Sequence, residues 1–181
     1  ILLSAHREEN IDTEKNFMSL FNAINRMAEK YDMPILYSCH PRSRNRLAAS
    51  GFKLDPRVIQ HEPLGFHDYN CLQMNAFAVV SDSGTLPEES SFFTSVGHPF
   101  PAICIRTSTE RPEAIDKGDF IIAGIDEKSL LQAVDTAVEL CRDGLHGIPV
   151  PDYVDENVST KVIKIIQSYV GIVNKMVWRK F

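Results

Sequence analysis

The stretch AVVSDSGTLPEESSFF, residues 78–93, contains the end of a buried strand and the beginning of a helix. Its apolar run stops abruptly at SDSG, residues 81–84, and the next turns carry two adjacent carboxylates, Glu88 and Glu89. A helix N-terminus leaves N–H groups unpaired and has a partial positive charge, and glycine permits close approach to the backbone. This turn is therefore a candidate site for a phosphate group that needs no lysine.

Two interpretations of this turn stay open. Ser83 and Gly84 would offer a hydroxyl and backbone N–H groups to a diphosphate, or Ser83 would simply cap a helix at a tight turn. The two carboxylates are also ambiguous. At least one of Glu88 and Glu89 is expected to complement the helix dipole, whereas the other would accept hydrogen bonds from the two hydroxyls of a ribose.

Short apolar runs with β-branched residues recur along the chain and predict strands. The runs begin at Ile1, Pro34, Arg57, Ala76, Pro101 and Asp119. Helical spacing of apolar residues separates them, over residues 14–31, 43–49, 68–75, 86–93 and 111–117, after an N-cap at Asp126, and over 157–170. This alternation predicts right-handed βαβ units and an α/β fold with a doubly wound parallel sheet.

We expect each long helix to bury one apolar stripe. In the last helix this stripe comprises Val158, Val162, Ile165, Ile166 and Tyr169, and Gly171 would end the helix. Residues 144–156, which are rich in Gly, Pro and Asp, are expected to form an extended connector before it.

Composition excludes several classes of function. The chain has 181 residues and a net charge of -5, which argues against nucleic acid as a partner because that binding needs clustered Lys and Arg. No apolar run is long enough to span a membrane. The cysteines, Cys39, Cys71, Cys104 and Cys141, are scattered in apolar runs without metal-ligand spacing. They predict reduced core residues in a cytoplasmic protein with no metal.

Ligands of open parallel sheets bind beyond the carboxyl ends of the strands. The residues that follow the predicted strands are unusually polar, and the loops lie at 6–10, 40–44, 82–84 and 106–113. Together they supply His, Arg, Ser and carboxylate groups to one rim. We therefore expect a cleft there that holds an anionic, hydroxylated ligand.

Three of these segments together resemble the non-hydrolysing UDP-N-acetylglucosamine 2-epimerase family. SAHREEN at 4–10 is similar to its H-R-x-E-N loop, SDSGTLPEES at 81–90 to its S-D-S-G-G-x-x-E-E loop, and RTSTERPEA at 106–114 to its R-x-x-T-E-R-P-E-A loop. The match spans nearly the whole chain and preserves the order of the motifs. It implies the second, Rossmann-like domain of a two-domain enzyme of GT-B type.

The resemblance implies roles for particular residues. Ser83 and Gly84 would hold the diphosphate, Glu89 the uridine ribose, and Tyr69 the uracil ring. His6 would approach the diphosphate near the reacting sugar and is the candidate catalytic residue. Arg111 and Glu113 would line the cleft, and Arg7 and His40 belong to matching loops with a lower rank.

The activity implied by the family inverts C-2 of a UDP-linked 2-acetamido sugar for cell-surface polysaccharide synthesis, without a cofactor. UDP is eliminated to leave a glycal-type intermediate and then adds back, and the family keeps its acid and base carboxylates in the first domain. The chain is thus expected to be a fragment that holds UDP but turns nothing over. Residues 1–156 would form the UDP-binding domain, and residues 157–181 would pack on the absent domain of a homodimeric parent.

Other functions stay open. Thr85 stands where most of the family has a second glycine, as in a branch that epimerises UDP-2-acetamido-2,6-dideoxy-L-talose. The nucleotide domain of a GT-B glycosyltransferase would bind the nucleotide in the same place. A non-catalytic nucleotide-binding module would use the same cleft without any catalytic half.

Overall fold

The computed structural model describes residues 1–180, except the side chains of Glu8 and Glu9. Phe181, the last residue of the predicted terminal segment, lies outside the described residues. One parallel six-stranded sheet with the order β3-β2-β1-β4-β5-β6 forms the centre of the fold. Its strands are β1 (Leu2–Ser4), β2 (Ile35–Ser38), β3 (Val58–His61), β4 (Val79–Ser81), β5 (Ala102–Cys104) and β6 (Ile121–Ile122). The predicted doubly wound α/β fold is confirmed.

Helices connect these strands. They are α1 (Glu8–Ile11), α2 (Glu14–Tyr31), α3 (Pro41–Ser50), α4 (Phe66–Asn75), α5 (Leu86–Ser95), α6 (Pro112–Asp116), α7 (Glu127–Arg142) and α8 (Val158–Met176), with a short 3-10 helix η1 (Pro151–Tyr153) before the last. The α2 bounds equal those predicted from its apolar stripe. The predicted cap of α7 is also confirmed, because Asp126 accepts a hydrogen bond from the backbone N–H of Ser129.

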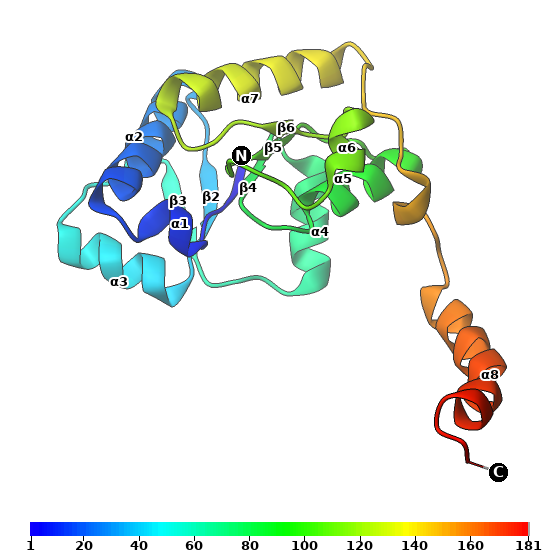
Figure 1. Cartoon of the computed structure of the whole chain (residues 1–181). Coiled ribbons are helices and arrows are strands. Elements are labelled where there is room, and N and C mark those ends of the chain that lie inside the picture. Colours follow the sequence, from blue (N-terminus) through cyan, green and yellow to red (C-terminus); the bar gives the residue numbers. More distant parts are fainter. Residues whose placement is uncertain (181) are drawn as a thin grey trace.

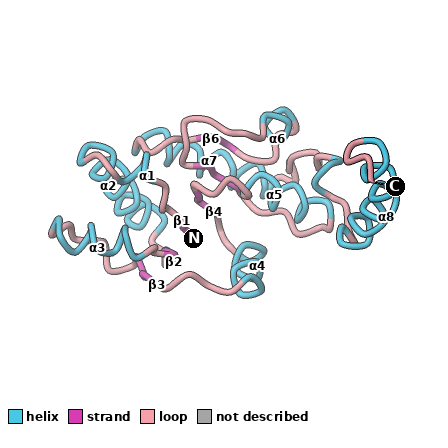
Figure 2. Tube along the Cα trace, turned by 60° about the horizontal axis from the view of Figure 1, so that its bottom comes forward, coloured by secondary structure: helices cyan, strands magenta, loops and turns pink. Residues whose placement is uncertain are grey.

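Alternate residues of the strands enter two separate cores. Leu3, Val80 and Ile103 face one core with the buried stripes of α2 and α7, whereas Leu2, Val79 and Ala102 face the other with residues of α5. This follows from the two-residue repeat of a strand, which sends successive side chains to opposite faces. Helices consequently cover both faces of the sheet, with α2 and α7 on one side and α4 and α5 on the other (Figure 1; Figure 2).

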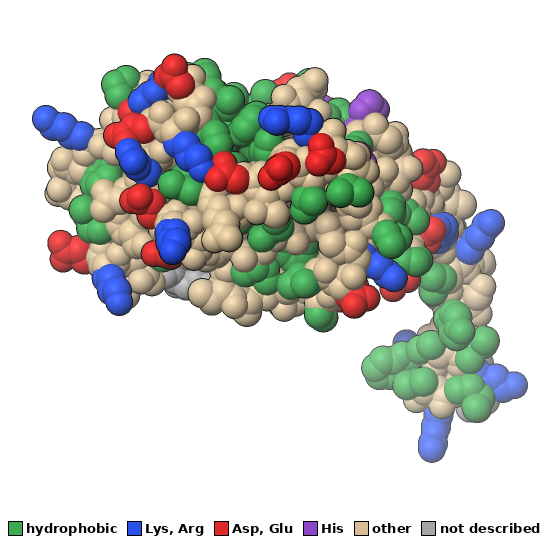
Figure 3. Space-filling model, turned by 90° about the horizontal axis from the view of Figure 1, so that it is seen from above, with side chains coloured by type: hydrophobic (Ala, Val, Ile, Leu, Met, Phe, Trp, Pro, Cys, Tyr) green, Lys and Arg blue, Asp and Glu red, His purple; other side chains and the backbone are tan. Residues whose placement is uncertain are grey.

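The last helix departs from the sequence prediction at its end. It runs through Gly171 to Met176, because Gly171 does not adopt the left-handed conformation that ends many helices. Its apolar stripe is exposed in this chain, with Ile166 54% and Tyr169 58% exposed, and its packing on another domain stays a prediction. Figure 1 shows α8 standing away from the body beyond the connector, and its apolar side chains gather on the surface in Figure 3.

Three smaller expectations also change. Residues 8–11, expected as loop, form the short helix α1. Thr85 rather than Ser83 occupies the N-cap position of α5. Cys71 is exposed on α4, so it is not a core residue, whereas Cys39 and Cys104 are buried as expected. No helix within residues 1–180 is long and apolar enough to cross a membrane.

Candidate functional site

The carboxyl ends of β1, β4 and β5 lie side by side at one edge of the sheet. Ser4 pairs with Ser81, and Ser81 pairs with Cys104. From β1 the chain continues to β2, which lies along one edge of β1, and it later returns to β4, which lies along the other edge. The topological switch point therefore falls between β1 and β4. The loops that begin at His6 and Asp82 therefore meet at the position where doubly wound folds bind their ligands.

Asp82 holds the two loops together. Its side chain is fully buried, and Oδ2 accepts hydrogen bonds from the backbone N–H groups of His6 and Arg7, both at 2.8 Å, and from Asn10 Nδ2 at 3.1 Å. Asn10 also donates to the carbonyl oxygen of Ile105 at 3.1 Å, which adds the loop after β5. A single buried carboxylate thus positions all three loops.

His6 lies at the surface of this cluster. Its Nδ1 is 3.1 Å from Asp82 Oδ1, and 47% of its side chain is exposed. The interaction with Asp82 raises the pKa of His6, although partial burial and the charge of Arg7 oppose the shift. Burial acts to raise the pKa of Asp82, but the donors from His6 and Arg7 outweigh it, so this pKa is lowered. The pair therefore favours an imidazolium beside a carboxylate.

Arg7 extends over the phosphate-binding candidate. Its Nε donates to the carbonyl oxygen of Asp82 at 3.0 Å, and a Cβ added at Gly84 would lie 3.5 Å from its Nη2. Glycine at position 84 thus leaves the backbone open beneath a guanidinium. The N-cap side chain of α5 makes no capping hydrogen bond. Ser83 N–H donates to Ser81 Oγ at 3.0 Å and Thr85 N–H to Ser83 Oγ at 3.3 Å, so Gly84 supplies the backbone N–H of this turn that is left for an anion.

Glu89 is held from two sides. Its Oε1 accepts a hydrogen bond from Thr85 Oγ1 at 2.7 Å, and its Oε2 accepts one from Gln73 Nε2 at 2.6 Å. A carboxylate has about four lone-pair directions, so acceptor capacity for ribose hydroxyls is left. Ser83 belongs to the same turn, because its hydroxyl lies 2.9 Å from Thr85 Oγ1.

Tyr69, the residue predicted to stack on uracil, lies on α4 with its side chain half buried against the second core. Burial first and then the charge of Glu89 raise the pKa of its hydroxyl to about 12. The hydroxyl of Tyr69 therefore lies within electrostatic range of the Glu89 carboxylate. The contact of Tyr69 with uracil stays a prediction.

Arg111 and Glu113 lie in the loop and short helix that follow β5. Arg111 Nε donates to Glu88 Oε1 at 2.6 Å, which joins this loop to the first turn of α5. Glu113 accepts a hydrogen bond from the hydroxyl of Tyr153 on η1. Glu88 is thus occupied by an ion pair, which separates its role from that of Glu89.

Sequence reasoning missed the positioning residues of the site. Asp82 and Asn10 were visible only as polar residues after strands, and Gln73 as part of a helix. The signal that could have found Asp82 is a carboxylate directly after a fully buried strand, where burial demands hydrogen-bond donors. Arg106 is a second buried charged residue that was not singled out. It is 5% exposed and donates two hydrogen bonds of 2.7 Å to Glu110, which lowers the pKa of Glu110 to about 2.

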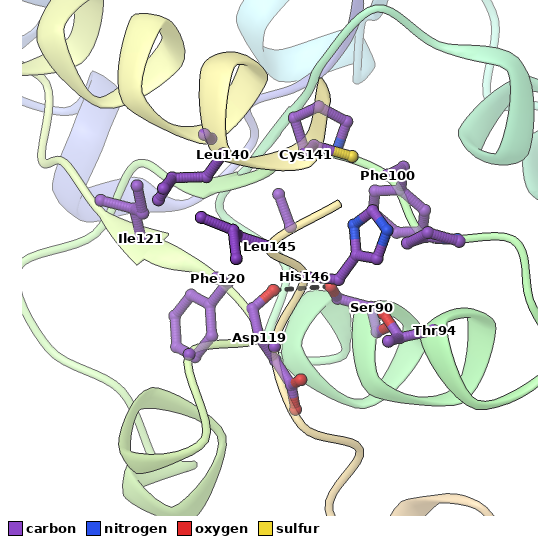
Figure 4. Close-up of a pocket in the computed structure, with 16 residues that line it drawn as sticks. Ser90, Thr94, Phe100, Asp119, Phe120, Ile121, Leu140, Cys141, Leu145 and His146 are labelled. Atoms are coloured by element: carbon purple, nitrogen blue, oxygen red, sulfur yellow. Dashed lines mark hydrogen bonds between the residues drawn. The ribbon is translucent and has the colours of Figure 1, made fainter. Parts of the chain in front are cut away.

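A separate cavity of about 50 Å³ lies away from this rim, where α5, α7 and the segments around Asp119 and His146 meet (Figure 4). Its lining contains none of the predicted site residues. Ser90 Oγ donates to the carbonyl oxygen of Asp119 beside it at 2.6 Å. Within the described residues, no group of three or more His, Cys, Asp or Glu side chains could hold a metal ion.

The fold and the position of the site define a Rossmann-like α/β domain with its ligand crevice at the switch point between β1 and β4. A family model described as UDP-N-acetylglucosamine 2-epimerase matches residues 1–167. The chain belongs to the UDP-N-acetylglucosamine 2-epimerase family, and the family assignment made from the three loops is confirmed.

Individual relatives agree with this assignment. The chain is 32% identical over 138 residues to UDP-N-acetylglucosamine 2-epimerase of Methanocaldococcus jannaschii, covering 74% of this chain and 36% of the relative. It is 34% identical over 134 residues to the Bacillus subtilis enzyme of that name, covering 73% of this chain and 33% of the relative. The chain thus spans about a third of the length of these relatives.

Solved structures give the same result. A UDP-N-acetylglucosamine 2-epimerase from Rickettsia bellii aligns with a TM-score of 0.82 and 36% identity, over 99% of this chain and 47% of that one. The Methanocaldococcus jannaschii enzyme in complex with UDP-GlcNAc and UDP aligns with a TM-score of 0.74 and 28% identity, over 93% of this chain and 44% of that one.

Proposed function

We propose that this chain is the UDP-binding half of an enzyme that inverts C-2 of a UDP-linked 2-acetamido sugar. The observation that carries the proposal is the rim itself, where Arg7 lies over Gly84 and Glu89 stands in the first turn of the helix that follows, in a chain of this family. A relative has been solved with UDP-GlcNAc and UDP. Its likeness to this chain supports the assignment of a UDP-sugar as the ligand.

The rim offers each part of the nucleotide a chemically suitable partner. The hydroxyl of Ser83 and the N–H group of Gly84, with the guanidinium of Arg7, would bind the diphosphate. Glu89 would accept the ribose hydroxyls, and Tyr69 would contact the uracil. Arg111 and Glu113 would line the side of the cleft formed by the loop after β5.

The reaction proposed for the longer protein has two steps. A base removes the C-2 proton as the bond between C-1 and the diphosphate oxygen breaks, which leaves a glycal-type intermediate and UDP. A proton then adds to the opposite face of C-2, and the UDP oxygen forms the bond to C-1 again. His6 as imidazolium would stabilise the charge that develops on the departing diphosphate. The acid and base carboxylates would come from another domain.

We also propose a division of the chain. Residues 1–156 would bind the nucleotide, and residues 157–181 would pack on the other domain of a homodimeric enzyme in the cytoplasm. The exposed apolar side chains of α8 support the second part, because such a helix is rarely left in water. The chain by itself would therefore bind UDP without turnover.

Calorimetric titration with UDP, UMP and ADP tests the nucleotide assignment. We expect UDP to bind more tightly than UMP or ADP, and both Glu89→Ala and the double variant Ser83→Ala, Gly84→Ala to weaken it. Binding of UDP and ADP with equal affinity, or UDP affinity unchanged in both variants, would contradict the assignment.

Solvent exchange tests the reaction class. A protein that joins this chain to the other domain of the family is expected to incorporate deuterium at C-2 of UDP-GlcNAc in D₂O. A glycosyltransferase would transfer the sugar to an acceptor without this exchange, and a non-catalytic module would do neither.

A further inference from the structure

We propose that Asp82 is a positioning residue: its buried carboxylate fixes a proton on Nδ1 of His6 and turns Nε2 toward the rim as the donor to the diphosphate. This inference rests on the proposed function for the identity of the anion. Its geometric part concerns only groups of this chain.

The carboxylate of Asp82 is held in one orientation. Three donors fix Oδ2, namely the N–H groups of His6 and Arg7 and the side-chain amide of Asn10. Oδ1 is buried, has no hydrogen-bond partner in the described part of the chain, and lies 3.1 Å from His6 Nδ1. An ionised carboxylate only accepts, so this close contact is favourable only when Nδ1 carries the hydrogen.

The opposite ring nitrogen is then the one that meets the ligand. Nδ1 is turned to Asp82 and about half of the side chain is exposed, so we infer that Nε2, on the other side of the ring, faces the rim. Two charged groups act on His6: Asp82 from the loop after β4, and Arg7 from its own loop. The carboxylate favours the imidazolium, in which Nε2 also carries a hydrogen and donates to an anion.

The arrangement has a consequence for pH. When His6 loses its proton, Asp82 keeps the remaining hydrogen on Nδ1, so Nε2 becomes an acceptor and no longer attracts a phosphate oxygen. UDP binding is therefore expected to weaken as the pH rises through the raised pKa of His6. Without Asp82 the neutral ring would be free to place its hydrogen on Nε2, and this loss would be smaller.

The test is ¹⁵N NMR of histidine-labelled protein during a pH titration, with His6 assigned by its absence in His6→Gln. Above its pKa, His6 is expected to show a protonated Nδ1 and an unprotonated Nε2. His40 is an internal control for the opposite tautomer, because its Nδ1 accepts a hydrogen bond from the backbone N–H of Arg42 at 3.3 Å. His40 should therefore show the hydrogen on Nε2 in the same spectrum.

The variant Asp82→Asn extends the test. Its amide can donate to Nδ1, so the neutral ring of His6 should change to the Nε2–H form, the His6 titration should move to lower pH, and UDP should bind about ten-fold more weakly at pH 7. A wild-type His6 with an unprotonated Nδ1 in its neutral form overturns the proposal even if the variant fails to fold. The predicted tautomer together with no UDP binding would overturn the proposed function and leave the contact between Asp82 and His6 intact.

Discussion

Thr85 Oγ1 donates a hydrogen bond of 2.7 Å to Glu89 Oε1 across the first turn of α5. Gln73 holds the other oxygen of the same carboxylate, so Glu89 is oriented before any ligand arrives. The neighbouring Glu88 differs, because it forms an ion pair with Arg111 at 2.6 Å. Two adjacent glutamates that the sequence does not distinguish therefore have different surroundings.

The first prediction uses this difference. Glu89→Gln removes the negative charge and one acceptor that the ribose hydroxyls would use, so we expect UDP affinity to fall about ten-fold or more. Glu88→Gln is the matched control and should change UDP affinity by less than about three-fold. Calorimetric titration measures both affinities. A larger loss of UDP affinity in Glu88→Gln than in Glu89→Gln would contradict the assignment of the ribose to Glu89.

A second prediction concerns the buried carboxylate of Asp119, whose two oxygens have no hydrogen-bond partner within the described residues. Burial raises the pKa of Asp119. The folded state thus holds this proton more tightly than the unfolded chain, and the charged form costs stability above the folded pKa. Asp119→Asn should increase the free energy of unfolding at pH 7 by about 1 kcal/mol.

This gain should disappear below the unfolded pKa of about 3.9, where the wild-type carboxyl is protonated in both states. Denaturant unfolding at several pH values measures it. Asp116→Asn, on the exposed end of α6, is the control and should change stability by less than about 0.5 kcal/mol. A loss of stability in Asp119→Asn at pH 7 would show that the ionised carboxylate is needed.

The third prediction concerns a close backbone contact. A Cβ at Gly147 would lie 2.6 Å from both N and Cα of Asp119, and backbone atoms cannot move aside as a flexible side chain does. Gly147→Ala should therefore cost roughly 1–3 kcal/mol of stability. Gly65→Ala is the control, since the nearest atom there is 3.9 Å away. Thermal unfolding should show a lower Tm for the first variant, and equal Tm values would contradict the contact.

The fourth prediction separates α8 from the cores. Leu130 on α7 is fully buried, whereas Ile166 on α8 is 54% exposed. Leu130→Ala should cost about 2–5 kcal/mol, and Ile166→Ala should change the stability of this chain by less than about 0.5 kcal/mol. If α8 packs on another domain, Ile166→Ala should become destabilising only when that domain is present. A large effect in the isolated chain would show that α8 packs on this body.

Local patterns predicted most of the fold because most of its helices and strands bury a periodic face. The apolar repeat of residues 14–31 marked α2 correctly. The same reasoning predicted the helix α8, but an apolar stripe shows that a helix needs a partner and not which body supplies it, so its packing on another domain stays a prediction. Gly171 illustrates a second limit, because a glycine ends a helix only where the backbone turns left-handed.

The candidate site was predicted in outline and not in its contacts. Four loops were placed on one rim from the general rule for parallel sheets, and the hydrogen bonds of Asp82 and Asn10 join three of them, those after β1, β4 and β5. The hydrogen bonds of Asp82 to residues more than 70 positions earlier in the chain depend on the strand order, which brings β4 beside β1. A local sequence pattern does not show which strands are neighbours, so Asp82, which holds the loops together, was not singled out.

The most direct test of the account is to map UDP on the chain by ¹⁵N NMR of the backbone amides. We predict that the largest shifts on adding UDP occur at Ser83 and Gly84, with further shifts at His6 and Glu89. ADP at the same concentration should produce smaller changes there. Shifts centred instead on the cavity near Ser90, Asp119 and His146, or no shifts at the switch point between β1 and β4, would contradict the assignment of the UDP site to this rim.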